Sequence, residues 1–408
     1  MQQKSGNKKK ISTIVIIASL AAIGITIISS VIVTSDLFNS DYRIEVEGEN
    51  IRLFSNKPYA PQIIEECKND VHCAVNSMQT IAVMENEQNV IDTFVSLIHL
   101  YEQTYSCHET AHHLGIWLYG YVEDVSEALS YSEQVCGGAI FHGVIQNYVM
   151  TQKLKGTSPD IIDIKSICPK PSGNPYYIEH WQCLHGLGHG LIGGYDYDIL
   201  SAIKRCEEFE PGWEQLSCSK GVFMQNVVHN LETGQGDFDE DDLYYPCNAV
   251  ESKRSASCYH YHVTYMVIKN KGNVQQTFND CDKILPADMV KYCYYGFGRQ
   301  LEPNIGTSIE NALLLCQAGQ KSEYHSDCLK GMLLTVVNVN TNTDRGFSFC
   351  KSLPEQYKQD CYDGLGRWIL MLQESQGDQL RNEECAKSEN DNYFKVCMNS
   401  SLESIVLL

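Results

Sequence analysis

Histidine spacing is the clearest chemical signal in this 408-residue sequence. Nine of the 13 histidines lie between residues 99 and 229. His108 and His112 are four residues apart, as are His185 and His189, and His142 lies between the two pairs. Residues four apart share one face of an α-helix, so each pair could present two imidazoles to one metal ion. We therefore predict all five as ligands of zinc or another divalent metal.

The first pair belongs to the segment His108-Glu109-Thr110-Ala111-His112, which resembles the zincin metallopeptidase motif. In that family the two histidines hold zinc and the glutamate is the general base for the metal-bound water. The resemblance implies that Glu109 is catalytic and that the reaction is hydrolysis. The competing interpretation is that these histidines are buried, hydrogen-bonded packing residues, and that nearby glycines permit close helix crossings.

The histidines lie within a repeat. Cys183-Leu-His-Gly-Leu-Gly-His-Gly190 is echoed by Cys293–Arg299 and Cys361–Arg367. From Cys168 onward the cysteines form seven couples, 168/183, 206/218, 247/258, 281/293, 316/328, 350/361 and 385/397, and all but the first are 11 or 12 residues apart. The second members recur every 33 to 40 residues, and helical patterns flank each couple. A period of this length with two helices per unit is typical of an α-solenoid.

We predict an all-α fold, a disulfide-stapled solenoid of helical-hairpin repeats behind an N-terminal transmembrane helix. In architecture it resembles tetratricopeptide-type repeats with one disulfide added to each unit. A bridge that closes about a dozen residues can contribute on the order of 3 kcal/mol. Cys136 has no partner 11 or 12 residues later, so we expect a Cys107–Cys136 bridge, while Cys67 and Cys73 flank a short connection.

The N-terminal sequence predicts where the protein lies relative to the cell membrane. Residues 1–10 are basic and cytoplasmic in this interpretation, and residues 11–33 are an uncharged apolar run long enough to span a bilayer as a signal anchor. A cleaved signal peptide is the alternative. A stalk at 34–62, irregular His-rich helical repeats at 63–195 and regular Cys-paired repeats at 196–408 would follow. Eighteen cysteines favour an oxidising compartment, so we expect a single-pass protein of the cell membrane with most of its chain extracytoplasmic.

Alignment of the repeats predicts a polar inner strip. His142, His185, Lys220, His260, Lys330 and Asp363 fall at one register, and His189 aligns with Arg299 and Arg367. Equivalent positions in successive repeats line one face of a solenoid, commonly the concave one. The groove should therefore be His-rich at its start and Arg-bearing later. We expect His260 and His262 on a polar helix face.

Composition and missing motifs limit the functions. A formal net charge of -20 argues against nucleic acid as a partner. Asp237, Asp239 and Asp241 alternate as in a calcium loop, but Asp242 stands where glycine is needed, so a solvated acidic loop is the favoured interpretation. We predict a binding module that takes a protein or peptide ligand in its His/Arg-bearing groove. The alternative is a zinc-dependent hydrolase in the first repeats, and a purely structural envelope component is a third possibility.

Overall fold

The computed structural model describes two compact units, Met1–Pro58 and Tyr59–Leu408. The residues described are 42–47, 50–55, 63, 65–67, 70–84, 87–100, 107–300, 309–338, 343–373 and 378–402. In the first unit, β1 (Tyr42–Glu47) pairs antiparallel with β2 (Asn50–Ser55). Alternating apolar and polar residues in β1 suit a strand. The predicted repeat blocks 63–195 and 196–408 both belong to the second unit.

The second unit is built from helices in its described part. They are α3 (Val71–Met84), α4 (Glu87–Leu100), α5 (Cys107–Val122), α6 (Val125–Ser130), α7 (Ala139–Leu154), α8 (Ile164–Ile167), α9 (Ile178–Gly194), α10 (Ile199–Cys206), α11 (Trp213–Thr233), α12 (Ser252–Lys269), α13 (Val274–Cys281), α14 (Val290–Arg299), α16 (Ile309–Cys316), α17 (His325–Asn338), α18 (Thr343–Ser352), α19 (Glu355–Leu372), α20 (Gln379–Cys385) and α21 (Asp391–Asn399). Short 3-10 turns lie at Cys136–Gly138, Pro159–Ile161, Ala287–Met289 and Ser322–Tyr324.

Apart from Cys107–Cys136, which joins α5 to a later 3-10 turn, the disulfides join short helices or loops to the longer helices that follow. All 18 cysteines are paired, and the bridges include every couple expected from the spacing together with Cys107–Cys136 and Cys67–Cys73. In the α13–α14 unit, for example, Cys281 ends the short helix and Cys293 lies in the longer one. The prediction of disulfide-stapled helix pairs is confirmed.

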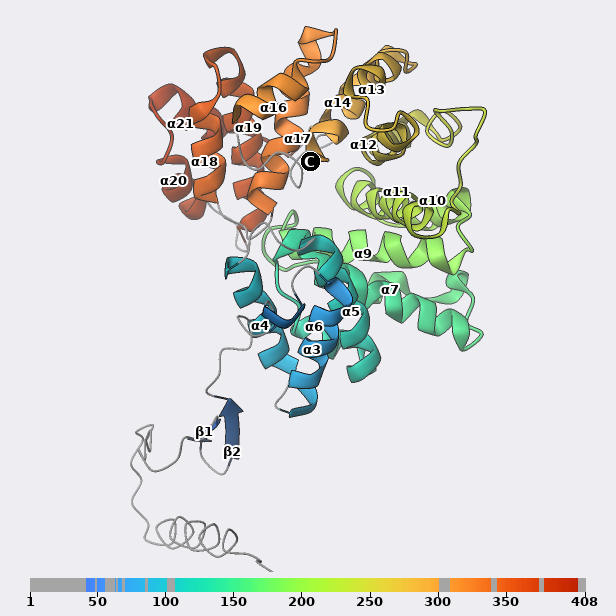
Figure 1. Cartoon of the computed structure of the whole chain (residues 1–408), viewed down its shortest axis with the longest axis vertical. Helices are drawn as coiled ribbons and strands as arrows, with labels where there is room; N and C mark the ends of the chain where they lie inside the picture. The colour runs from blue at the N-terminus through green and yellow to red at the C-terminus, as the bar shows by residue number, and fades with distance from the viewer. Residues whose placement is uncertain are drawn as a thin grey trace, which may run out of the picture. The chain divides into compact units, whose positions relative to one another are not determined.

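The longer helices of successive pairs pack on one another in chain order. Helix α5 contacts α7, and the series continues through α9, α11, α12, α14, α17 and α19 to α21. In Figure 1 these helices follow an arc from α5 and α7 to α19 and α21. The arc curls back on itself. This is seen in the Asn174 side chain, just before α9, which donates hydrogen bonds to the carbonyls of Leu370 and Gln373, almost 200 residues later in the chain. Helices from both ends of the series therefore enclose a common interior.

The expectation of a transmembrane helix is corrected. Among the helices that the structure describes, none is both long enough and apolar enough to cross a membrane. A span needs about 20 consecutive apolar residues, whereas described helices of that length, such as α11, carry charged and amide side chains. Residues 11–33, where the span was predicted, lie outside the described residues. The described chain therefore consists of disulfide-rich helical pairs. The β1–β2 hairpin is a second difference from the prediction, which expected an all-α fold.

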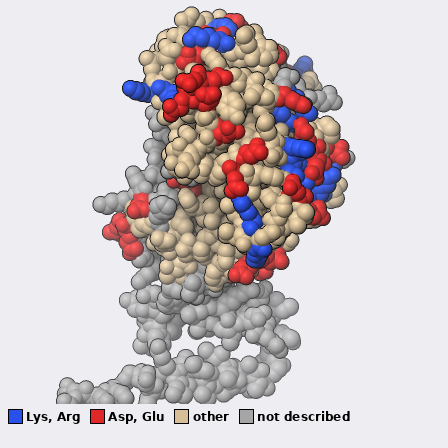
Figure 2. Space-filling model, turned by 90° about the vertical axis from the view of Figure 1, so that its right-hand side faces the viewer, with Lys and Arg blue, Asp and Glu red and all other residues tan. Residues whose placement is uncertain are grey.

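Surface charge agrees with the acidic composition. On the face shown in Figure 2, Lys and Arg side chains lie in small groups that Asp and Glu interrupt. A nucleic-acid surface needs a continuous basic field, and this face does not offer one.

Candidate functional site

Five histidines from three consecutive inner helices meet in the interior. His108 and His112 come from α5, His142 from α7, and His185 and His189 from α9. The ring centroids of His142 lie 4.7 Å from His185, 5.1 Å from His189 and 5.3 Å from His108. The His112 ring lies 5.3 Å from that of His189. The structure thus brings together all the histidines that the sequence predicted as ligands.

Glycines set the short distance between these helices. A Cβ at Gly115 of α5 would lie 2.1 Å from the Ile140 carbonyl oxygen of α7, and a Cβ at Gly186 of α9 would lie 2.8 Å from the His142 Cα of α7. No side chain fits at such positions, so the backbones touch only because the residues are glycine. The packing role that the sequence suggested for the glycines is therefore real, and it draws the imidazoles together.

Hydrogen-bond acceptors orient the rings. His108 donates from Nδ1 to the Cys136 carbonyl at 2.9 Å. His142 donates from Nε2 to Gln182 Oε1 at 2.9 Å, and His189 from Nδ1 to Gln225 Oε1 at 2.7 Å. An oxygen acceptor fixes the proton on the nitrogen that faces it, so the second ring nitrogen keeps its lone pair. This outer contact is the one that metal-ligating histidines usually make.

The remaining ring nitrogens have no hydrogen-bond partner in the described part of the chain. They are His108 Nε2, His112 Nε2, His142 Nδ1, His185 Nδ1 and His189 Nε2. A buried polar atom normally finds a partner, and an isolated exception calls for an explanation. Five exceptions in one cluster make it the candidate functional site.

Burial keeps these imidazoles neutral. It lowers the pKa of His108 to about 4, with the Arg299 guanidinium adding to the effect and the Cys136 hydrogen bond opposing it. Burial also lowers the pKa of His189 to about 3, and the hydrogen bond that His189 donates to Gln225 opposes this shift. The pKa values of His142 and His185 lie well below the usual value, chiefly through burial. Neutral imidazole is the form that binds metal ions.

Three of the histidines lie in an arrangement that could hold a metal ion. One ring nitrogen from each of His142, His185 and His189 lies within 4.8 Å of the other two, and all three residues are buried. Tetrahedral coordination at about 2.1 Å would place such nitrogens about 3.4 Å apart, so binding would draw the rings slightly closer. A cavity of about 50 Å³ adjoins this set. It is lined in part by His108, His142, His185, Lys220, His260 and Arg299.

Glu109 does not join the cluster. It is exposed on α5 and is absent from the described residues that line the cavity. A general base must reach the metal-bound water or a neighbour of it, and the exposed position does not provide that contact.

The expectation that His260 and His262 lie on a polar helix face is wrong, because they are only 1% and 2% exposed. His262 donates from Nε2 to the Leu243 carbonyl at 2.6 Å and packs on Phe238 and Tyr265. His260 lines the cavity, and neither of its nitrogens has a hydrogen-bond partner among the described residues. Aromatic neighbours from other segments bury both rings, which the local sequence did not indicate.

The acidic segment shows the solvated-loop arrangement. Asp237 accepts a hydrogen bond from the Tyr245 hydroxyl at 3.0 Å. Asp242 accepts from the Asn248 amide at 2.6 Å and from the Tyr244 backbone at 3.0 Å. These carboxylates shape their own turn, and the group that could hold a metal ion among the described residues is the histidine set.

Comparison with other proteins adds no relative: no protein-family model, no curated protein and no solved structure matches this chain. The tetratricopeptide and zincin resemblances thus stand on the residues alone.

Proposed function

We propose that this protein binds one transition metal ion at the histidine centre formed by His142, His185 and His189, with His108 and His112 beside it. The observation that carries the proposal is the convergence of three buried histidines, each with one unpartnered ring nitrogen; the opposite nitrogens of His142 and His189 donate to glutamine oxygens, and that of His185 faces the Met224 sulfur. Imidazole ligands suit zinc, copper, iron and nickel, and zinc is the ion that we take as the reference. The disulfides support an extracytoplasmic location for this activity.

The adjoining cavity favours binding of a small ligand at the metal over binding of a polypeptide. A cavity of about 50 Å³ has room for a few water-sized groups. A protein or peptide ligand, the first expectation from the sequence, would need a larger groove.

Metal-dependent hydrolysis is the second candidate, because a metal-bound water could occupy the cavity beside His142 and His185. The base for this reaction would have to be a cavity residue, since Glu109 is exposed.

Zinc binding by the full oxidised chain, produced without a histidine tag, tests the proposal. We expect one tightly bound zinc per chain by elemental analysis after dialysis, and a loss of affinity of about 100-fold or more in the His142→Ala, His185→Ala and His189→Ala variants. The control is His229→Ala, because the His229 ring stacks on Tyr197 at 3.6 Å and lies outside the cluster. A folded protein that binds no zinc, or that loses as much affinity in the control, contradicts the proposal.

A further inference from the structure

Two basic side chains, Lys220 and Arg299, also line the cavity beside the histidine centre. Lys220 of α11 is 1% exposed, and its Nζ has no hydrogen-bond partner among the described residues. Its Nζ lies over the face of Trp181, 5.6 Å from the centre of the ring. A buried ammonium without a hydrogen-bond acceptor is rare, because it loses its hydration and no oxygen atom replaces the lost water.

Arg299 of α14 lines the same cavity. Its guanidinium carbon lies 4.6 Å from the centre of the Tyr261 ring, and its Nη2 lies 3.9 Å from Met224 Sδ. His185 Nε2 lies 3.5 Å from the same sulfur, so Arg299 and the histidine centre are near neighbours. None of the described residues that line this cavity is acidic.

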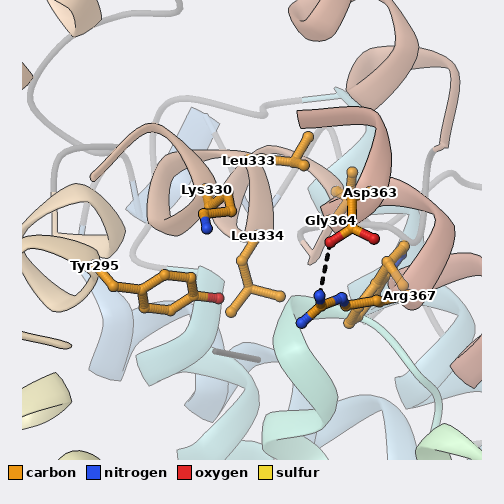
Figure 3. A pocket seen from close by; sticks show the side chains of 9 residues that line it. Tyr295, Lys330, Leu333, Leu334, Asp363, Gly364 and Arg367 are labelled. Atoms are coloured by element: carbon orange, nitrogen blue, oxygen red, sulfur yellow. Dashed lines mark ion pairs between the residues drawn. The ribbon is translucent and has the colours of Figure 1, made fainter. Parts of the chain in front are cut away.

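Later repeats neutralise the equivalent cations. Lys330 is at the register of Lys220 and forms an ion pair with Asp327 at 2.8 Å. Arg367 is at the register of Arg299 and pairs with Asp363 at 2.7 Å. Figure 3 shows this arrangement, with the Arg367 guanidinium beside the Asp363 carboxylate and Lys330 facing the same small cavity.

The two repeats that carry Lys220 and Arg299 lack those carboxylates. Ser217 stands where Asp327 stands, one residue before the repeat cysteine, and its hydroxyl donates to the Trp181 carbonyl at 2.7 Å. Tyr295 stands where Asp363 stands, four residues before the arginine. The chain therefore keeps the cations in these repeats and omits their internal counterions.

We propose that Lys220, Arg299 and His260 bind a small oxyanion in this cavity, next to the metal ion held by the histidines. Lysine offers three donors, arginine a planar fork and histidine one more, which together match an anion with several oxygen atoms. Cations beside a metal ion repel it, and an anion between them removes that repulsion. The inference rests on the proposed metal centre for its chemical meaning: the anion would be the ligand or substrate of the metal.

Calorimetric titration of the full oxidised chain with sulfate and with nitrate tests this inference. We expect binding to the zinc-loaded protein, weakened at least about tenfold by Lys220→Met, with zinc affinity retained. Ser217→Asp should weaken anion binding similarly, because it supplies the internal carboxylate. Lys330→Met is the matched control and should leave anion affinity unchanged.

The two proposals can fail separately. Zinc binding without anion binding at about 10 mM, or equal anion affinity in the Lys220→Met variant, overturns the anion site. An adventitious ion only, bound equally by the wild type and by both variants, overturns it as well. Anion binding that depends on Lys220 in a protein that takes up no zinc supports the anion site and overturns the metal centre.

Discussion

Replacing Lys220 by methionine should stabilise the protein in the absence of metal and anion. The Lys220 amino group is buried without a hydrogen bond, and burial lowers its pKa well below the usual value of 10.5, with Arg299 adding to the effect. Methionine has a similar length and no polar atom. An unsatisfied buried polar group costs about 1–3 kcal/mol, and more when it is charged, so we expect the free energy of unfolding at pH 7 to rise by about 2 kcal/mol.

The pH dependence gives this prediction a second readout. Between the lowered pKa of folded Lys220 and the usual value of 10.5, the unfolded chain carries a proton that the folded chain lacks. Stability of the wild type therefore rises with pH through this window by about 1.4 kcal/mol per unit from this group. Lys220→Met has no such contribution, so the gap between variant and wild type should shrink as pH rises towards 10.

Urea unfolding at several pH values, with the disulfides intact and no oxyanion in the buffer, measures both effects. Lys330→Met is the control with the opposite sign, because it leaves the 8%-exposed Asp327 without its ion pair. A Lys220→Met variant that is less stable than the wild type at pH 7, or a gap that does not change with pH, refutes the reasoning.

Three further predictions follow from the packing and from the hydrogen bonds of the cluster. Gly115→Ala should destabilise the protein by about 3 kcal/mol, because the added Cβ forces α5 and α7 apart. The control is Gly120→Ala in the same helix, where a Cβ meets only a side-chain atom at 3.4 Å; this variant should be neutral or stabilising by up to about 1 kcal/mol. Urea unfolding distinguishes the two variants. Gln225→Leu removes the hydrogen-bond acceptor of His189 and should weaken zinc binding about 10- to 100-fold. A chelator competition measures this, and a loss of affinity below about threefold would contradict the role assigned to Gln225. Burial lowers the pKa of His189 to about 3 and that of His262 to about 4, so the unfolded chain binds more protons than the folded chain below pH 6.5. The free energy of unfolding of the metal-free protein should therefore fall by up to about 3 kcal/mol per group as pH drops from 6.5 towards 4. Equal stability at pH 7 and pH 4.5 would contradict this prediction.

Much of the fold could be predicted because the cysteines mark every repeat. Couples such as Cys281 and Cys293 report a loop between two helices at constant spacing, and even the irregular Cys107–Cys136 bridge followed by elimination. The His185–His189 spacing likewise indicated a shared helix face, because side-chain periodicity is a local property.

The rest of the site depends on long-range geometry. Gln182 and Gln225 could not be identified as orienting groups, because their contacts with the histidines link residues from neighbouring repeats. The alignment placed Lys220 and Arg299 on the inner strip, but their shared cavity depends on the curvature of the helix series, which the repeat length does not determine. One signal was available in the sequence: Ser217 replaces the aspartate that accompanies the equivalent lysine in a later repeat.

The position of the metal is the most direct test of the account. An anomalous difference map collected at the zinc edge, from crystals of the zinc-loaded full chain, would show it. We predict one strong peak about 2.1 Å from ring nitrogens of His142, His185 and His189. A map without a peak at the histidine cluster, or with its strongest peak at the acidic segment Gly236–Asp242, would contradict the central claim.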